Sequence, residues 1–149
     1  MRWILGTALL ASAVFANPAL AQDCAITVEG NDQMQFVQKE LRVSTSCESI
    51  TVTLKHVGKL AANVMGHNWV LTATGDFEAV AKDGQTAGTA NDFVPPNDAR
   101  VLAATKVIGG GEETTISFDP SALEPGGDYT FFCSFPPHSV LMNGKLIVE

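Results

Sequence analysis

The sequence has little positive charge. Its 149 residues include nine Lys and Arg against 16 Asp and Glu, a formal net charge of -7, and no two basic residues are adjacent. Proteins that bind nucleic acid or anionic lipid need clustered basic side chains to attract phosphate groups. The sequence shows no such cluster, so nucleic acid and anionic membranes are not expected partners.

Long hydrophobic runs are also missing, except at the start of the chain. Residues 1–21, MRWILGTALLASAVFANPALA, hold one Arg, then an apolar stretch, and end in Ala-Leu-Ala. The stretch is shorter than a bilayer-spanning helix and is broken by Asn17 and Pro18, whereas Ala-x-Ala is the pattern that signal peptidase cuts. We therefore predict a cleaved signal peptide over residues 1–21 and an exported single domain over residues 22–149, with no membrane anchor.

Cysteine is scarce, and the number of cysteines is odd. Cys24 and Cys47 lie near the ends of two early strand-like segments and could close a loop of about 24 residues. In an oxidising compartment such a bridge stabilises a protein by roughly 3–4 kcal/mol, because it restricts the unfolded chain. Cys133 would remain unpaired, which is unusual for an exported protein and suggests a separate role.

Short alternating segments dominate the remainder of the sequence. Ile50, Val52 and Leu54 alternate with polar residues, and Ile116 and Phe118 do the same. A period of two indicates strands with one buried face. Turns rich in Gly and Asn separate about seven or eight such segments, among them residues 100–108, 129–135 and 141–148. The pattern predicts an all-β sandwich or barrel.

One helix is expected within this β pattern. Phe77, Val80 and Ala81 have helical spacing, and Asp83 and Gly84 are expected to end the helix near residue 82. The polar interval from residue 83 to residue 96 is expected to form a flap over one side of the sandwich.

The end of the sequence places three metal-binding side chains within ten residues. Cys133, His138 and Met142 surround a short loop that contains two prolines, and His67 is the best candidate for a fourth donor because it has the strand parity of Trp69. Thiolate and thioether are soft ligands and imidazole is borderline, so this set favours copper over magnesium, calcium or manganese. Two His, one Cys and a weakly bound Met are the ligands of a blue-copper electron-transfer centre.

Each of these residues also has a purely structural interpretation. Met142 shares parity with apolar residues of the last strand and fits a core position, and a free Cys is often simply buried. His67 would fit a polar position at the edge of the sandwich. His56 is a second histidine outside the loop, and its place on the apolar face of a strand favours a core histidine over a ligand. The combination of Cys133, His138 and Met142 favours ligation.

Two other classes of function remain open. The first is an exported zinc- or copper-binding protein without a redox role, because Zn²⁺ accepts the same Cys and His donors. The second is a copper enzyme. Such enzymes need additional metal sites, and three histidines in the chain are too few to build them.

Several long stretches resemble the azurins, the periplasmic cupredoxins of bacteria. They are residues 30–36 (GNDQMQF), 64–71 (VMGHNWVL), 106–112 (KVIGGGE) and 131–142 (FFCSFPPHSVLM). The resemblance covers nearly all of residues 22–149 and implies a cupredoxin-like Greek-key β-sandwich of about eight strands with one short helix in a flap. It also implies a one-electron carrier of the periplasm, rather than an enzyme, with one type 1 copper per chain that cycles between Cu(I) and Cu(II).

The resemblance further implies a set of copper ligands. His67, Cys133 and His138 would form a trigonal plane around copper. Met142 would be a distant axial ligand, and the carbonyl of Gly66 would lie opposite it.

Other roles implied by the resemblance concern residues around the ligands. Cys24 and Cys47 would form a disulfide, and the backbone amides of Asn68 and Phe135 would donate hydrogen bonds to the sulfur of Cys133. One departure is Pro137, where azurins usually have Gly before the ligand histidine. Proline fixes φ and lacks an N–H, so the backbone there is expected to be stiffer and more apolar.

An uncharged apolar rim around His138 is the expected docking surface. Its residues are Leu60, Val64, Met65, Phe135, Pro136 and Pro137. Such a rim suits brief contacts with transient redox partners, such as c-type cytochromes or copper nitrite reductase. The carrier itself is expected to be a monomer.

Overall fold

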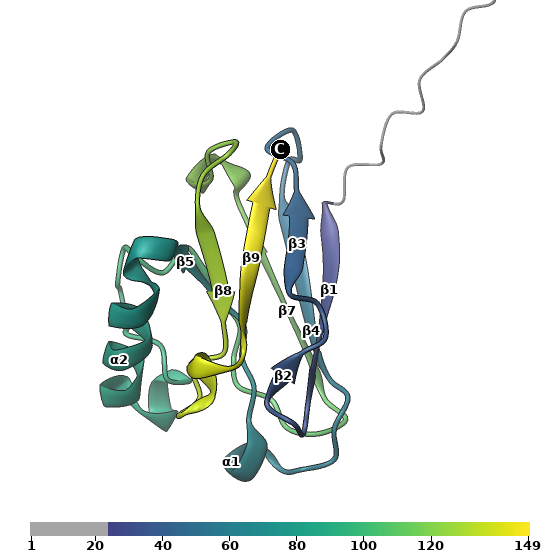
Figure 1. Ribbon diagram of the computed structural model, residues 1–149, viewed down its shortest axis with the longest axis vertical. Helices are drawn as coiled ribbons and strands as arrows, with labels where there is room; N and C mark the ends of the chain where they lie inside the picture. The colour runs from purple at the N-terminus through teal and green to yellow at the C-terminus, as the bar shows by residue number, and fades with distance from the viewer. Residues whose placement is uncertain (1–23) are drawn as a thin grey trace, which may run out of the picture.

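Two β-sheets pack face to face in the structure, a computed structural model that describes residues 24–149 (Figure 1). The predicted signal peptide, residues 1–21, lies outside the described residues. The first sheet has the order β2 (Gln35–Phe36), β1 (Ala25–Asn31), β4 (Ile50–His56), β7 (Glu113–Phe118). The second has the order β3 (Glu40–Val43), β9 (Asn143–Val148), β8 (Tyr129–Phe132), β5 (Val70–Ala73), β6 (Ala103–Ala104). The predicted β-sandwich is confirmed, with nine strands in the described part of the chain.

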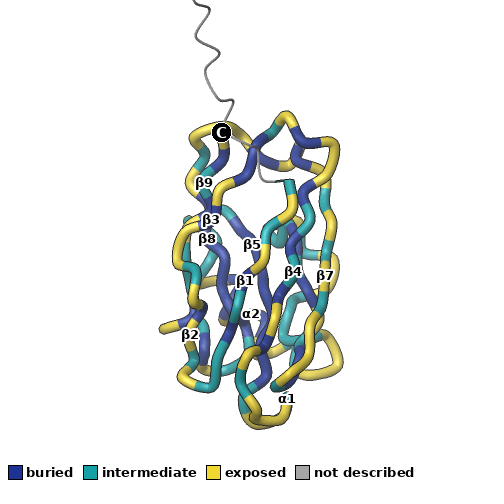
Figure 2. The backbone as a smooth tube through the Cα atoms, turned by 90° about the vertical axis from the view of Figure 1, so that its right-hand side faces the viewer, coloured by how far each residue is buried: buried dark blue, intermediate teal, exposed yellow. Residues whose placement is uncertain are grey.

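The core lies between the sheets, where the inward faces of the strands are buried (Figure 2). On β4, Ile50, Val52, Leu54 and His56 are buried while the residues between them reach the surface, which confirms the predicted period of two. Trp69 is fully buried, and its ring stacks on Phe118 of β7, in the opposite sheet, with centroids 6.4 Å apart. These contacts fix the distance between the two sheets and therefore the positions of the loops at their ends.

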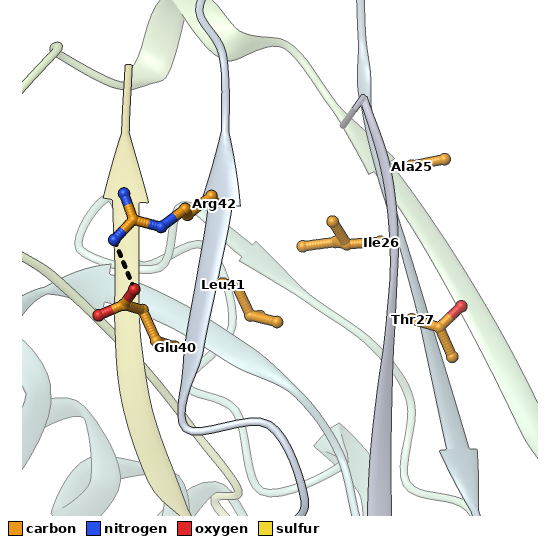
Figure 3. Close-up of a pocket in the computed structure, with 6 residues that line it drawn as sticks. All are labelled: Ala25, Ile26, Thr27, Glu40, Leu41 and Arg42. Atoms are coloured by element: carbon orange, nitrogen blue, oxygen red, sulfur yellow. Dashed lines mark hydrogen bonds and ion pairs between the residues drawn. The ribbon is translucent and has the colours of Figure 1, made fainter. Parts of the chain in front are cut away.

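Two of the strand pairs are parallel, β1 with β4 and β3 with β9, and the others are antiparallel. β1 and β3 lie at neighbouring edges of the two sheets, with a groove between them (Figure 3). Ile26 and Leu41 point toward each other across it, while Arg42 forms ion pairs with Glu40 and Glu149. Charged side chains on an edge strand discourage further strand pairing with other molecules.

The helix on the flank of the second sheet is longer than the sequence pattern predicted. α2 runs from Phe77 to Ala87, so the expectation that Asp83 and Gly84 end it is wrong. Gly84 is buried inside the helix, and a Cβ there would collide with the backbone oxygen of Phe93. Gly84 thus allows a close contact with the following segment, and the helix ends instead at Gly88, whose φ is +68°. The first five residues of the predicted flap, 83–87, are therefore helical.

Strand boundaries also differ from the predicted ones, chiefly near the ligand-bearing loops. Of residues 100–108, only Ala103 and Ala104 form a strand, because the hydroxyl of Thr105 accepts the N–H of Trp69 and interrupts the ladder. β8 ends at Phe132 and β9 begins at Asn143, with the 3₁₀ turn His138–Val140 between them. A short helix, α1 (Ala62–Met65), was not predicted. No helix among residues 24–149 is long and apolar enough to cross a bilayer.

The predicted disulfide between Cys24 and Cys47 is present, with Cα atoms 5.6 Å apart. It joins the start of β1 to the turn before β4, at the end of the sandwich opposite α1.

The double variant Cys24→Ser/Cys47→Ser is expected to lower the free energy of unfolding by about 3 kcal/mol, because its unfolded chain is no longer restricted by the loop. Urea unfolding followed by circular dichroism measures the change. The native chain with a thiol reductant is the matched control and should show the same loss. A loss below about 1 kcal/mol would contradict the expectation.

Candidate metal centre

One end of the sandwich gathers the loops that carry the candidate ligands. His67 precedes β5, Cys133 follows β8, and His138 and Met142 belong to the connection from β8 to β9. Antiparallel pairing of β5 with β8 and of β8 with β9 brings these three chain segments to the same end. α1 lies at this end too, so the loop from β4 to β5 closes over it (Figure 1).

The side chains of His67, Cys133 and His138 meet in the interior at this end. One donor atom from each lies within 4.8 Å of the others. The sulfur of Cys133 lies 4.0 Å from Nδ1 of His67 and 3.7 Å from Nδ1 of His138. All three residues are at most 2% exposed. The structure thus brings together the three strong donors that the sequence singled out.

His67 is fixed by contacts on both sides of its ring and along its backbone. Its N–H and carbonyl bridge to Ile108, with N–O distances of 3.0 and 2.8 Å. Nε2 lies 2.9 Å from the carbonyl oxygen of Asn31. Because a carbonyl only accepts, Nε2 must carry the proton, and Nδ1 is left with a free lone pair facing Cys133. His56 stacks on one face of the ring of His67, with ring centroids 4.2 Å apart.

The thiol of Cys133 is surrounded by backbone groups. It lies 3.8 Å from the carbonyl oxygen of Gly66, and the backbone amides of Asn68 and Phe135 donate hydrogen bonds toward the sulfur. Complete burial raises the pKa of this thiol to about 12, although the two amides oppose that effect. The metal-free protein therefore holds a protonated thiol at neutral pH.

The loop from Cys133 to Met142 closes tightly on itself. The N–H of Cys133 donates to the carbonyl of Met142 at 2.9 Å, and the N–H of Met142 donates to the carbonyl of His138 at 2.7 Å.

Burial lowers the pKa of His138 to about 4, with a further contribution from His67, so its imidazole is neutral at neutral pH. The peptide bond between Pro136 and Pro137 is cis.

Met142 is fully buried, and its side chain borders Gly30, as does that of His67. A Cβ on Gly30 would lie 2.8 Å from Cδ2 of His67 and 3.4 Å from the terminal methyl of Met142. Both side chains therefore border the same backbone position. Any side chain at residue 30 would displace one of them, so Gly30 leaves the space that they occupy.

Asn68 links the two strands that carry His67 and Cys133. Its side-chain oxygen accepts the N–H of Ser134 at 2.8 Å, and its amide nitrogen donates to the hydroxyl of Ser134 at 2.7 Å and to the carbonyl of Asp92 at 2.8 Å. Asn68 and Ser134 are buried. Two of these hydrogen bonds join Asn68, which follows His67, to Ser134, which follows Cys133. They limit how far the two donor side chains can separate.

His56 lies outside the group of donors. Its Nδ1 accepts the N–H of Gly58 at 3.1 Å, so its Nε2 donates to the carbonyl of Met65 at 2.7 Å. Both nitrogens are satisfied and the residue is 2% exposed, which confirms the prediction of a core histidine. It supports the ring of His67 rather than offering a donor of its own.

Sequence patterns did not identify three contributors to this end of the molecule. Asn31 acts through its backbone carbonyl, which no side-chain pattern can reveal. Ser134 could have been suspected from its place beside Cys133. Asp92 lies in the segment after α2 and has a left-handed φ of +51°. No sequence pattern marks it as part of this end of the molecule.

The expected docking residues surround this end, with different exposures. Leu60 is 41% exposed and Val64 is 59% exposed, and Pro137 is also exposed. Met65, Phe135 and Pro136 are partly buried. His138 itself is only 2% exposed, so a partner protein would contact these neighbours rather than its ring. The centroids of the Phe135 and His138 rings lie 4.8 Å apart.

The donor set fits a single transition-metal ion. Nitrogen and sulfur donors bound at about 2.1 and 2.3 Å and separated by 120° lie about 3.8 Å from each other. The two sulfur–nitrogen distances in the structure, 3.7 and 4.0 Å, are close to this value. One thiol, two imidazoles and a buried thioether nearby favour copper among the biological metals.

Comparisons with known proteins agree with this chemistry. Residues 22–149 match the family of copper-binding proteins described as the plastocyanin/azurin family. The chain is 55% identical to the azurin of Bordetella pertussis over 141 residues, which cover 95% of this chain and 93% of that protein. It is 48% identical to the azurin of Pseudomonas aeruginosa over 132 residues, or 89% of each. Among solved structures, the azurin Az-iso2 of Methylomonas sp. strain J superposes with a TM-score of 0.81 at 44% identity, covering 85% of this chain and 98% of that one.

Metal binding is expected to release about one proton per chain at neutral pH, because Cys133 must lose its proton while both imidazoles are already neutral. Calorimetric titration with Zn²⁺ in buffers of different ionisation enthalpy measures the number. Zn²⁺ accepts the same donors and has no redox chemistry. Cys133→Ser is the control and should release almost none. No release from the native chain would mean that its thiol is already ionised.

Proposed function

The chain belongs to the plastocyanin/azurin family of copper-binding proteins, and from this membership and the geometry of the site we propose how it carries electrons. It is a blue copper electron carrier rather than an enzyme, and its cofactor is copper. The observation that carries the mechanism below is the buried group of His67, Cys133 and His138.

We assign the copper ligands from the donors that face one another. Nδ1 of His67, the sulfur of Cys133 and Nδ1 of His138 are the three strong ligands, because their separations fit one ion. Met142 and the carbonyl of Gly66 are the weaker ones. The burial of Met142 beside Gly30, which His67 also borders, and the 3.8 Å separation of the Gly66 oxygen from the Cys133 sulfur support this assignment.

Bound copper supplies the one-electron step by cycling between Cu(I) and Cu(II). The residues around it keep the ligands in nearly one arrangement in both states. Asn31 holds the proton of His67 on Nε2, and the amides of Asn68 and Phe135 stabilise a thiolate at Cys133. A ligand set that needs little rearrangement exchanges electrons with a low barrier.

Burial of the ligands also limits the chemistry at this site. Each of the three strong donor residues is at most 2% exposed, and Met142 is fully buried. Phe135, packed on the ring of His138, adds an apolar wall on that side. An electron can cross such a wall, whereas a substrate molecule cannot reach a buried ligand without displacing it. This arrangement favours electron transfer over catalysis at the metal.

We propose that residues 1–21 are a cleaved signal peptide and that residues 22–149 form the exported cupredoxin domain. The resemblance to azurins implies a periplasmic protein. The family match begins at residue 22, directly after the Ala-Leu-Ala pattern. The Cys24–Cys47 disulfide fits an oxidising compartment. Together these observations support a periplasmic location for the carrier.

The docking surface is proposed to lie over the apolar rim at the copper end. Leu60, Val64 and Pro137 provide exposed apolar side chains there, and Met65 lies beside Val64 on α1. An uncharged apolar rim favours short-lived contacts, which a shuttle between redox proteins requires. Redox partners such as c-type cytochromes or copper nitrite reductase, and a monomeric carrier, are consistent with such a surface.

Cu(II) added to the purified metal-free domain of residues 22–149 is expected to produce an intense blue thiolate-to-copper band that saturates at about one equivalent. Ascorbate should bleach the band and air or ferricyanide should restore it. Visible absorption measures both steps. Cys133→Ser should fold, as judged by circular dichroism, but remain without the band. A colourless native protein whose Cys133 still reacts with alkylating reagents would refute the ligand assignment, and a band that cannot be bleached would favour metal binding without a redox role.

Met65→Lys is expected to slow electron exchange with a c-type cytochrome by about tenfold, because a buried charge in an apolar contact costs more than 1 kcal/mol. The visible spectrum should not change, since the side chain of Met65 is not a ligand. Stopped-flow kinetics measures the rate. Ala122→Lys, which adds the same charge to an exposed position in the 3₁₀ turn Pro120–Ala122, is the matched control. Equal rates for Met65→Lys and the native protein would place docking elsewhere.

A further inference from the structure

We propose that Asp92 and Phe93 form a clasp that positions the three ligand-bearing segments of the copper end. The inference rests on the proposed ligand roles of His67, Cys133 and His138, and it assigns a role to a segment distant from them in the sequence. The two residues follow the 3₁₀ turn Thr89–Asn91, which comes directly after α2. The pair contacts Val107, Asn68 and Phe135, and through these residues it reaches each of the three segments.

The first contact holds the segment of His67. The carboxylate of Asp92 accepts the N–H of Val107 at 2.8 Å. The next residue, Ile108, makes the two backbone hydrogen bonds that bridge to His67. Asp92 therefore restrains the strand segment on which the backbone of His67 depends.

The second contact reaches the segment of Cys133. The carbonyl of Asp92 accepts a hydrogen bond from the side chain of Asn68 at 2.8 Å. The same amide group is bonded twice to Ser134, which follows Cys133 directly. Asp92 thus uses its side chain for the segment that bridges to His67, and its backbone for Asn68, which joins the segments of His67 and Cys133.

The third contact reaches the segment of His138. The ring of Phe93 packs edge-on against Phe135 with centroids 5.2 Å apart, and Phe135 packs against His138 at 4.8 Å. The amide of Phe135 is also one of the two that face the sulfur of Cys133. Phe93 therefore supports the ring that separates the last histidine from solvent.

The backbone of the clasp has a conformation that few residues adopt. Asp92 and Phe93 have φ values of +51° and +54°. Asp tolerates the left-handed region, whereas a bulky Phe rarely does. The surrounding structure maintains it: the N–H of Phe93 donates to the carbonyl of Gly88 at 3.0 Å, and Gly84 of α2 leaves room for the backbone of Phe93. Strained backbone that is held in this manner often serves a functional site.

The positioning role of Asp92 and Phe93 can be tested in the metal-free protein, without copper. Cys133 reacts with iodoacetamide only when its surroundings open, because the thiol is buried. When closing is fast, the alkylation rate follows the equilibrium population of the open form. Loosening the clasp should increase that population locally while the remainder of the fold stays intact.

Asp92→Ala is expected to speed alkylation of Cys133 in the metal-free chain by about tenfold, the effect of losing one buried hydrogen bond. Below the unfolding transition, the accelerated rate should hardly depend on urea, because a local opening exposes little surface. Asp92→Asn should restore the native rate, since Asn accepts the same N–H and tolerates the left-handed region. With copper bound, the blue band of Asp92→Ala should shift while that of Asp92→Asn should not.

Asp98→Ala is the matched control from the same loop. The side chain of Asp98 bonds to Arg100, and these bonds do not reach a ligand segment. This variant should alkylate at the native rate even where it lowers overall stability. A native rate for Asp92→Ala, or an acceleration that follows its loss of global stability and its urea dependence, would overturn the clasp. Because the first readout needs no metal, failure of the copper titration would leave this result interpretable.

Discussion

The copper end depends on keeping a thiol and two imidazoles buried and close together before any metal binds them. Burial disfavours the charged form of each group, as the raised pKa of Cys133 and the lowered pKa values of His67 and His138 show. The donor group itself contains no carboxylate or ammonium group, and the charge of Asp32 is only a minor opposing effect at His67. The protein instead surrounds the three side chains with backbone amides, carbonyls and aromatic rings, whose positions are fixed by the two sheets.

Much of this architecture could be predicted from the sequence, because it rests on side-chain patterns. The alternation of Ile50, Val52 and Leu54 predicted a buried strand face, and the spacing of Cys133, His138 and Met142 predicted the ligand loop. Longer stretches that resemble azurins pointed to the β-sandwich and to the disulfide. His67 was correctly preferred over His56 as a member of the donor group, because strand parity placed it inward beside Trp69.

The features that the sequence did not predict are those determined by backbone contacts between distant segments. Glycine often ends a helix, but Gly84 lies inside α2, where the lack of a side chain leaves space for the backbone of Phe93. The sequence alone does not distinguish these two roles of a glycine. The ladder expected over residues 100–108 is interrupted by a side-chain hydroxyl, that of Thr105. Asn31 and Asp92 act through carbonyl oxygens. A carbonyl is common to every residue, so its use leaves no mark in the sequence.

The pairing of β3 with β9 has a consequence for how the protein is made. Glu40 and Lys145, partners in this ladder, lie near opposite ends of the chain, and β9 also pairs with β8 immediately after the ligand loop. A growing chain therefore cannot complete its second sheet, or close the loop from Cys133 to Met142, until residues 143–148 of β9 have been synthesised. Contacts between such distant residues form late and slowly. Maturation of the copper site thus follows the synthesis of β9, and the chain has no finished metal pocket before that point.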